Sequence, residues 1–318
     1  MQTRREIYKS IKEIPREEYL AAGTGLCSGC CGLLALRLFH KALGPQTIFI
    51  NAAGCLTLLA VFPFSPFRSS WLYTAMGSAP AGAQGVRDAL DMLIAKGRLA
   101  KSEDLKVVVV TGDGAAHGIG LQATLAAIHR GLDFYYLCYD NEAFANTGFQ
   151  TSPASPFGSR SGTTPATAAT PAGHTRRKQD LFELWRAARP AYVGTVSPAH
   201  PLDFLDKVAR ASRLPGPKLF VSLAPCPAGW GIEPAESVAV AKLAVDTGVW
   251  PLKEARNGTV VHTMVPRQFR PVGEYLQRQA RYAHLFAPTP QEQILRRLQA
   301  DVDRYWKRCD AASVTRVV

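Results

Sequence analysis

Long hydrophobic runs are absent from this sequence. The longest apolar stretch, LTLLAVFPF from Leu56, ends in prolines and is too short to cross a bilayer. The first residues, MQTRREIYKSIKEIPREEYL, contain no basic segment followed by an apolar one, so we expect no secretory leader. These absences predict a soluble, cytoplasmic protein with no membrane partner.

Cysteine is also scarce, with 7 residues in a chain of 318. Three of them, Cys27, Cys30 and Cys31, nevertheless lie within five positions of each other. Cytoplasmic cysteines stay reduced and usually serve metals or redox chemistry. The Cys-x-x-Cys pair of Cys27 and Cys30 could begin a redox dithiol, a zinc site or an iron–sulfur site, and the pair alone does not choose among them.

Acidic residues are outnumbered, because 25 Asp and Glu face 37 Lys and Arg, for a formal net charge of +12. Such an excess often marks a nucleic-acid surface, but the sequence contains no recognisable nucleic-acid-binding motif. The basic residues are scattered apart from TRRK at 175–178. An acidic protein partner would suit this charge equally well. A zinc-stabilised nucleic-acid-binding module remains an alternative, which the pattern of strands disfavours.

Short β-branched or aromatic runs alternate with helical stretches along most of the chain. The expected strands are QTIFIN (46–51), KVVVVT (106–111), DFYYLCYD (133–140), AYVGTV (191–196) and PKLFVSLA (217–224). Helices are expected over 83–97, 119–130, 179–188 and 201–213. Nearly continuous apolar strands separated by helices predict an α/β fold, with a mostly parallel sheet covered by helices on both faces.

Two segments depart from this alternation. Residues 147–178 are rich in Pro, Gly, Ser and Thr, and we predict a functional loop there because a connection this long is unusual inside a compact domain. The segment PQEQILRRLQADVDRYWKRC predicts an amphipathic helix with one apolar face. That face consists of Leu295, Leu298, Val302 and Trp306. We therefore expect a domain over 1–255 and a C-terminal extension over 256–318 that packs on it or on a partner subunit.

A second motif, Gly112-Asp113-Gly114, ends the strand at 106–111 and opens a helix. Glycines there let the backbone turn tightly and bring its N–H groups to an anion. Asp113 supplies an oxygen ligand that suits a magnesium ion bridging phosphates. Asn141 ends the next strand, and parallel strands end at one edge, so both side chains can converge on one cation. Gly-Asp-Gly by itself is also compatible with an ordinary turn.

The whole pattern resembles the signature of thiamine diphosphate enzymes. This resemblance implies that Asp113, Asn141 and the backbone carbonyl of Ala143 hold Mg²⁺. YDNEAFANTGFQTS (139–152), APCPAGW (224–230) and LAVDTGVWPL (243–252) look like the β, thiamine diphosphate-binding subunit of 2-oxoacid:ferredoxin oxidoreductases, closest to the pyruvate:ferredoxin oxidoreductase branch. The resemblance extends from Leu26 to about Leu252 and implies a thiamine diphosphate-binding fold with cysteine-bearing loops.

The resemblance also implies a function for four of the cysteines. It implies that one [4Fe–4S] cluster is bound by Cys27, Cys30, Cys55 and Cys226. Such a cluster requires four thiolates. Structural zinc would use the same ligands, whereas a dithiol would leave two of them unexplained. Cys31 stands where relatives usually have glycine and is either a spare buried thiol or a competing ligand.

The implied reaction is the oxidative decarboxylation of a 2-oxoacid, with single electrons passing through the cluster to ferredoxin and the acyl group usually passing to coenzyme A. Asn146 and Thr147 match residues that line the substrate pocket of the family. The chain shows no convincing carboxylate to activate the aminopyrimidine ring. We therefore expect it to need a pyrimidine-binding α subunit, usually with a ferredoxin-like and a γ subunit or domain. A non-catalytic iron–sulfur relay or scaffold subunit is the alternative.

Two positions depart from the pyruvate-type pattern. Gly118 stands where relatives often carry Asp, and Thr57 stands where they often carry Glu. Both changes remove acid near the expected site, so they predict a more anionic substrate, such as oxalate or a dicarboxylate. His117 follows the Gly-Asp-Gly motif, and its role stays open.

Overall fold

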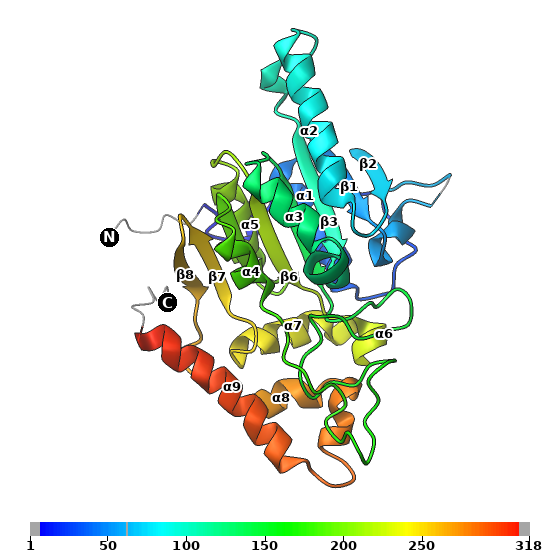
Figure 1. Ribbon diagram of the computed structural model, residues 1–318, viewed down its shortest axis with the longest axis vertical. Coiled ribbons are helices and arrows are strands. Elements are labelled where there is room, and N and C mark those ends of the chain that lie inside the picture. The colour runs from blue at the N-terminus through cyan, green and yellow to red at the C-terminus, as the bar shows by residue number, and fades with distance from the viewer. Residues whose placement is uncertain (1–6, 62, 312–318) are drawn as a thin grey trace.

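Eight strands form one sheet in the order β2-β1-β3-β4-β6-β5-β7-β8 in the computed structural model, which describes residues 7–61 and 63–311 (Figure 1). The strands are β1 (Thr47–Ala52), β2 (Ser70–Thr74), β3 (Lys106–Gly112), β4 (Tyr135–Asp140), β5 (Tyr192–Val196), β6 (Lys218–Leu223), β7 (Leu252–Arg256) and β8 (Thr259–Met264). The first six are parallel, and within the described sheet β7 runs in the opposite direction, pairing antiparallel with both β5 and β8. This confirms the predicted mostly parallel α/β fold.

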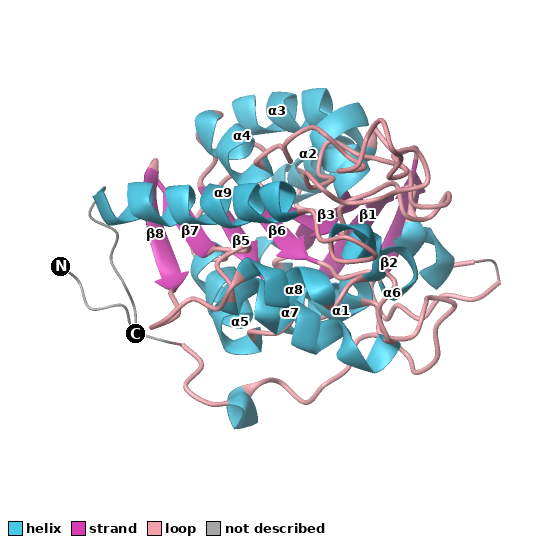
Figure 2. Cartoon of the chain, turned by 90° about the horizontal axis from the view of Figure 1, so that it is seen from below, coloured by secondary structure: helices cyan, strands magenta, loops and turns pink. Residues whose placement is uncertain are grey.

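Helices cover both faces of the sheet (Figure 2). One face carries α2 (Ala79–Ala95), α3 (Leu121–His129) and α4 (Leu181–Ala187), and the other carries α1 (Cys31–Leu43) and α5 (Pro201–Ala211). In β3, Val107 and Val109 join one apolar core while Val108 and Val110 join the other. A strand buried on both faces has no room for polar side chains, which is why its sequence is a continuous apolar run.

The carboxyl ends of four adjacent strands meet at one edge of the sheet, because β1, β3, β4 and β6 are parallel neighbours. Cys55 follows β1, Asp113 follows β3, Asn141 follows β4 and Cys226 follows β6. The short helix α6 (Pro227–Trp230), α7 (Ser237–Asp246) and α8 (Val272–Gln277) lie beyond this edge (Figure 1). The topology therefore brings together residues from four separate motifs.

The C-terminal part begins inside the sheet. The expected division between residues 255 and 256 falls within β7, and β8 pairs with β7 to complete the sheet. Helix α9 (Glu292–Ala311) then crosses the molecule. Its Leu295, Leu298 and Val302 pack against the main core, and Trp306 is buried with its indole Nε1 donating to Gly248 O at 3.0 Å.

The long segment 147–178 contains no helix, and its only strand-like contacts are isolated bridges. Its backbone is ordered by hydrogen bonds across its own turns, such as Gly158 N to His174 O and His174 N to Ser159 O, both 2.9 Å. Within the described residues, each helix is too short or too polar to span a bilayer.

Candidate functional site

The four cysteines predicted as cluster ligands line one cavity of about 450 Å³. Cys27 and Cys30 precede α1, whereas Cys55 and Cys226 occupy the turns that follow β1 and β6. Asn141 lines the same cavity, so the cysteine motif and the predicted magnesium motif face one space. This is the juxtaposition that the parallel topology leads one to expect.

Local backbone geometry directs the first two cysteines toward each other. Gly29 has a φ of +73°, and a Cβ there would lie 2.2 Å from Pro234 O, so only glycine fits. The turn that results lets Cys30 N donate to Cys27 O at 3.2 Å. Opposite them, Cys226 Sγ accepts a hydrogen bond from Gly229 N at 3.3 Å. A backbone amide thus already points at the sulfur of Cys226.

Burial raises the pKa of three of these thiols. The pKa values of Cys30 and Cys226 lie above the usual range, and that of Cys55 rises to about 12, with the neighbouring thiols adding to the effect of burial. A thiolate is the form that ligates iron or zinc. Four thiolates at this position therefore require a positive charge among them, which a metal centre supplies.

Within residues 7–61 and 63–311, no group of three or more His, Cys, Asp or Glu side chains could hold a single metal ion. An iron–sulfur cluster is larger than a single ion, since its own iron and sulfide atoms stand between the four thiolates. A zinc ion would instead need all four sulfurs about 2.3 Å from one atom.

Three oxygen atoms converge beside the cavity. The side-chain oxygen of Asn141 faces the carbonyl oxygen of Ala143 at 2.8 Å and Asp113 Oδ1 at 2.9 Å. Without a cation, turning the amide over would let Asn141 donate to both oxygens. With one, adjacent ligands of octahedral magnesium, each about 2.0–2.1 Å from the metal, lie about 2.9 Å apart. The two spacings from Asn141 are thus close to those between adjacent ligands of such an ion.

Asp113 itself is fully buried. Its Oδ2 accepts a 2.5 Å hydrogen bond from the Ser152 hydroxyl, which fixes the carboxylate with Oδ1 toward Asn141. Burial, followed by the nearby Asp140 carboxylate, raises the pKa of Asp113 to about 8. A bound divalent cation would oppose both effects and restore the ionised form.

Glu142 holds the loop that presents these ligands. It lies between Asn141 and Ala143 with a φ of +66°, a left-handed conformation that costs about 1 kcal/mol or more for a residue with a Cβ. Both carboxylate oxygens are paired, with Lys178 Nζ at 2.8 Å and Arg281 Nη2 at 2.5 Å. These buried ion pairs stabilise the unusual backbone that brings the side chain of Asn141 and the carbonyl of Ala143 together.

A tryptophan links this loop to the cysteine turn. Trp230 belongs to the APCPAGW segment, and its indole Nε1 donates to the backbone oxygen of Asn141 at 2.9 Å. The Arg281 guanidinium lies 3.8 Å from the centre of the same indole ring. The turn of Cys226 and the loop of Asn141 are therefore fixed relative to each other.

The other residues predicted for the site are the glycines of the Gly-Asp-Gly motif and the two residues of the expected substrate pocket. Gly114 is required by close approach, because a Cβ there would lie 2.2 Å from the Phe144 ring, whereas a Cβ on Gly112 would meet Tyr139 at 3.3 Å. Asn146 is exposed and lines the cysteine cavity. Thr147 is exposed next to it, and its hydroxyl donates to the side-chain oxygen of Gln150 at 2.5 Å.

Residues whose roles the sequence left open also take clear positions. Cys31 is buried in the core beneath the cavity, and Cys138 is buried within β4. His117 is buried in the π-helical turn Gly114–Ile119, where burial lowers its pKa to about 3. The Thr57 hydroxyl accepts from Gly54 N at 3.2 Å and so holds the Cys55 turn.

Several residues of this site were not predicted from the sequence. They are Glu142, Ser152, Lys178, Trp230 and Arg281. Lys178 belongs to the basic run TRRK, which by itself indicated only charge. Arg281 reaches Glu142 across 139 residues of chain, a separation that no local pattern reveals.

Comparison with known proteins gives concordant results. Residues 52–221 match the family described as thiamine pyrophosphate enzyme, C-terminal TPP binding domain. Pyruvate synthase subunit PorB of Methanosarcina barkeri is 38% identical, covering 90% of this chain and 94% of that one. The same subunit of Methanocaldococcus jannaschii is 37% identical over 93% and 98% of the two chains. Ketoisovalerate oxidoreductase subunit VorB of Pyrococcus horikoshii is 36% identical over 88% and 91%.

A solved structure shares the fold. It is the 2-oxoglutarate:ferredoxin oxidoreductase from Magnetococcus marinus with 2-oxoglutarate, coenzyme A and succinyl-CoA bound. The TM-score is 0.52 with 21% identity, covering 69% of this chain and 71% of that one. At this identity the likeness concerns the fold alone.

Proposed function

Because this chain belongs to the β subunits of the 2-oxoacid:ferredoxin oxidoreductases, the thiamine-dependent family of its pyruvate synthase relatives, we propose that its two motifs hold magnesium–thiamine diphosphate and a [4Fe–4S] cluster side by side. The observation that carries the proposal is the single cavity lined by Cys27, Cys30, Cys55, Cys226 and Asn141. Electrons leaving a thiamine-bound substrate would then have a cluster within reach.

The magnesium ligands would be Asp113, Asn141 and the carbonyl of Ala143, supported by the 2.8–2.9 Å spacing of their oxygens. The Gly112–Gly114 turn would present backbone N–H groups to the diphosphate. When bound, thiamine diphosphate supplies the carbanion for decarboxylation, and the cluster accepts electrons one at a time. The ion pairs of Glu142 would keep the ligand loop in place before the cofactor arrives.

Substrate contacts are proposed for two residues at the rim. The amide of Asn146 would donate a hydrogen bond to the substrate carboxylate, since it is exposed to the cysteine cavity. Thr147 would orient that turn, because its hydroxyl already bonds Gln150 at 2.5 Å. The turns that contain Cys30 and Cys226 would place backbone N–H groups where they can donate hydrogen bonds to the cluster sulfurs.

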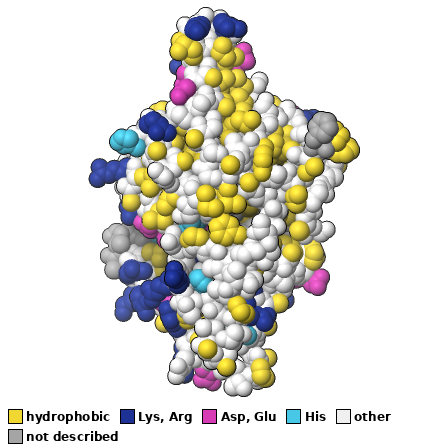
Figure 3. Space-filling model, turned by 45° about the vertical axis from the view of Figure 1, so that its right-hand side comes forward, with side chains coloured by type: hydrophobic (Ala, Val, Ile, Leu, Met, Phe, Trp, Pro, Cys, Tyr) yellow, Lys and Arg dark blue, Asp and Glu magenta, His cyan; other side chains and the backbone are white. Residues whose placement is uncertain are grey.

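A pyrimidine-binding α subunit is the main proposed partner, together with ferredoxin-like and γ subunits and ferredoxin as electron acceptor. The chain leaves several large apolar side chains exposed around the cysteine turn and the edge strand β2: Leu58, Val61, Phe64, Leu72 and Tyr73. Figure 3 shows hydrophobic side chains gathered over the middle of the face from which α2 projects. Apolar groups gathered on a surface are typical of subunit contacts.

The substrate is proposed to be pyruvate or a more anionic 2-oxoacid, with coenzyme A as acyl acceptor, or oxalate, whose oxidation yields only CO2 and leaves no acyl group to transfer. Thr57 and Gly118 leave the site with less negative charge than the pyruvate-type pattern. In the assembled complex, turnover of oxalate or 2-oxoglutarate above that of pyruvate would support the more anionic substrate. A clear preference for pyruvate would overturn the proposal of a more anionic substrate and would leave pyruvate as the proposed substrate.

The decisive experiment is anaerobic purification of the full chain, followed by iron, sulfide and zinc analysis and electron paramagnetic resonance after dithionite reduction. We expect about four irons and four sulfides per chain with a reduced-cluster signal. Binding of thiamine diphosphate should require Mg²⁺ in calorimetry. Zinc or no metal in chain never exposed to air would overturn the cluster, and turnover by the isolated chain would overturn the need for an α subunit.

A further inference from the structure

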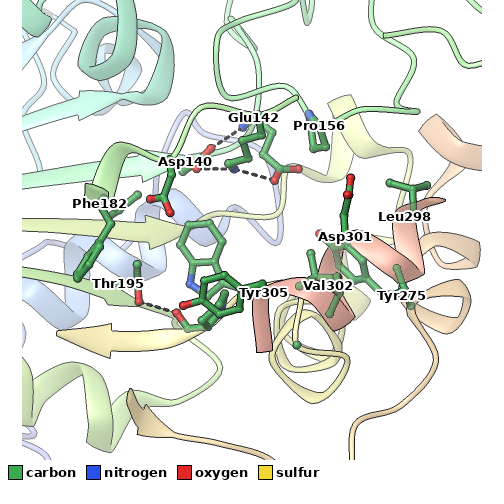
Figure 4. A pocket seen from close by; sticks show the side chains of 18 of the residues that line it. Asp140, Glu142, Pro156, Phe182, Thr195, Tyr275, Leu298, Asp301, Val302 and Tyr305 are labelled. Atoms are coloured by element: carbon green, nitrogen blue, oxygen red, sulfur yellow. Dashed lines mark hydrogen bonds and ion pairs between the residues drawn. The ribbon is translucent and has the colours of Figure 1, made fainter. Parts of the chain in front are cut away.

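A second cavity, of about 310 Å³, lies between α9 and the sheet (Figure 4). Asp140 and Glu142 border it on one side, and Asp301, Val302 and Tyr305 of α9 face them across it. This α9 cavity shares no lining residue with the cysteine cavity. It is therefore a separate space, although Glu142 places it directly behind the ligand loop.

Most of the α9 cavity wall is hydrocarbon. The apolar side chains that line it include Leu181, Phe182, Trp250, Val272, Leu298 and Val302. A concave, mainly apolar space of this size with a few polar groups is the usual form of a small-molecule site. Its volume suits a molecule of modest size with a hydrocarbon body.

The two lysines of this wall differ in how they are paired. Lys178 Nζ lies 2.6 Å from Asp140 Oδ2 and 2.8 Å from Glu142 Oε1, so its charge is closely matched. Lys253 is 3% exposed, yet its carboxylate partners Asp180 and Glu183 both lie at 3.5 Å. Charge-assisted hydrogen bonds are normally about 2.7–2.9 Å long.

Aromatic rings surround the Lys253 ammonium. It lies 4.2 Å from the centre of the Phe182 ring and 5.3 Å from that of Tyr305. Rings stabilise a buried cation but provide no hydrogen-bond acceptor in their plane. An ammonium carries three donors, so this one can still bind an oxygen atom at short distance.

The acidic residues of the wall do not favour a cationic ligand. Three of the four have closer cations, and the fourth, Asp180, has a half-exposed side chain that water solvates, 3.5 Å from Lys253 Nζ. Asp140 and Glu142 share Lys178, and Asp301 Oδ1 accepts from Arg304 at 2.7 Å and from Arg177 at 3.0 Å. The buried charge left with the weakest pairing in the wall is that of Lys253. The α9 cavity is thus mainly apolar, and its one weakly paired buried cation is the ammonium of Lys253, which can donate hydrogen bonds.

We propose that the α9 cavity is a binding site for a small aliphatic monocarboxylate, whose carboxylate accepts hydrogen bonds from Lys253 and whose hydrocarbon chain lies between α8 and α9. This site is independent of the proposed function, since it involves none of the cysteines or magnesium ligands. Its occupant would nevertheless contact Glu142, and its binding would therefore affect the loop that carries Asn141 and Ala143.

The test is isothermal titration of the full chain with hexanoate and with hexanamide, which has the same length but no charge. Hexanoate should bind about tenfold or more tightly than hexanamide, as one charge-assisted hydrogen bond would give. Lys253→Met keeps most of the length of the side chain without its charge and should abolish that preference. Leu298→Trp should fill the chamber and weaken both ligands.

Equal binding of the two ligands by the wild-type chain, or binding of neither, would overturn the proposal, and this measurement needs no variant. A preference for hexanoate that persists in Lys253→Met would overturn it as well. Circular dichroism and thermal unfolding of each variant establish that lost binding is not lost folding. Iron and sulfide content should stay unchanged in Lys253→Met, because the two cavities are separate.

Discussion

The two cavities of this protein are built from different kinds of sequence. The cysteine cavity takes its ligands from short motifs, each at the carboxyl end of a strand or in the turn before α1. The α9 cavity takes Asp140, Glu142 and residues 248–251 from two of the quoted segments, but most of its wall comes from residues outside any motif, as far as Tyr305. Chemistry that needs particular residue types leaves a pattern in the sequence, whereas a space left between packed elements does not.

Glu142 is where the two regions meet. Its backbone presents Asn141 and Ala143 to the predicted metal, and its carboxylate lines the α9 cavity. Lys178 and Arg281, which hold it, come from the long loop and from the segment after α8. The comparison can therefore be tested by changes that affect one cavity, the other, or both.

The largest effect is expected from Cys226→Ala, which removes one cluster ligand. Iron and sulfide should fall from about four each per chain to near zero, with loss of the reduced-cluster signal. Hexanoate binding in the α9 cavity should not change. Cys138→Ala is the matched control, because Cys138 is buried within β4 away from the cavity wall, and it should keep its iron. Full iron content in Cys226→Ala would contradict the ligand assignment.

Glu142→Gln should affect both regions. Removing one partner of a buried ion pair leaves Arg281 without its carboxylate and should lower the free energy of unfolding by about 3–5 kcal/mol. The freed loop should also bind Mg²⁺–thiamine diphosphate more weakly. Urea unfolding and calorimetry measure the two effects. Glu292→Gln, at an exposed pair with Arg296, should change stability by less than about 1 kcal/mol.

If Glu142→Gln were as stable as the wild type, the ion pairs could not be what holds the left-handed backbone. Unchanged cofactor affinity in a destabilised variant would instead separate the ligand loop from the charged network. Either result would contradict the inference that Glu142 connects the two cavities.

The sequence predicted the parts of this molecule that follow from strand pattern and topology. Continuous apolar runs such as that of β3 gave the buried strands, and the parallel order then placed Asp113 and Asn141 at one edge. The strands it missed are β2, β7 and β8. Strand β7 reads LKEAR, and its two charged residues are buried by distant partners: Glu254 pairs with Arg210 at 2.9 Å, and Lys253 lies over the Phe182 and Tyr305 rings.

The contacts that position the candidate site could not be predicted from local sequence patterns either, because they join residues that are far apart in the chain. Lys178 reaches Glu142 across 36 residues, and Trp230 reaches Asn141 across 89. Each of these side chains would also suit an ordinary surface or core position. Only the folded arrangement distinguishes them.

A smaller effect, confined to the α9 region, is expected from Trp306→Phe. The ring would be kept, but Gly248 O would lose the 3.0 Å hydrogen bond from the indole. An unpaired buried carbonyl and the lost volume should cost about 2 kcal/mol in urea unfolding. Iron content should be unchanged, and Arg296→Ala on the exposed face of α9 serves as the control. A loss of iron in Trp306→Phe would show that the two regions do not fold independently of each other.

The smallest effect is expected from Cys31→Ala, which tests whether the third cysteine of the first motif competes for the cluster. Cys31 is 1% exposed and packs in the core, and burial, with the nearby thiols, raises its pKa to about 12. It should therefore act as a small apolar side chain, so its loss should cost about 1 kcal/mol and leave four irons in place. Iron analysis and urea unfolding of the variant measure both. A fall in iron equal to that of Cys226→Ala would make Cys31 a ligand, and one of the four assigned cysteines would then be free.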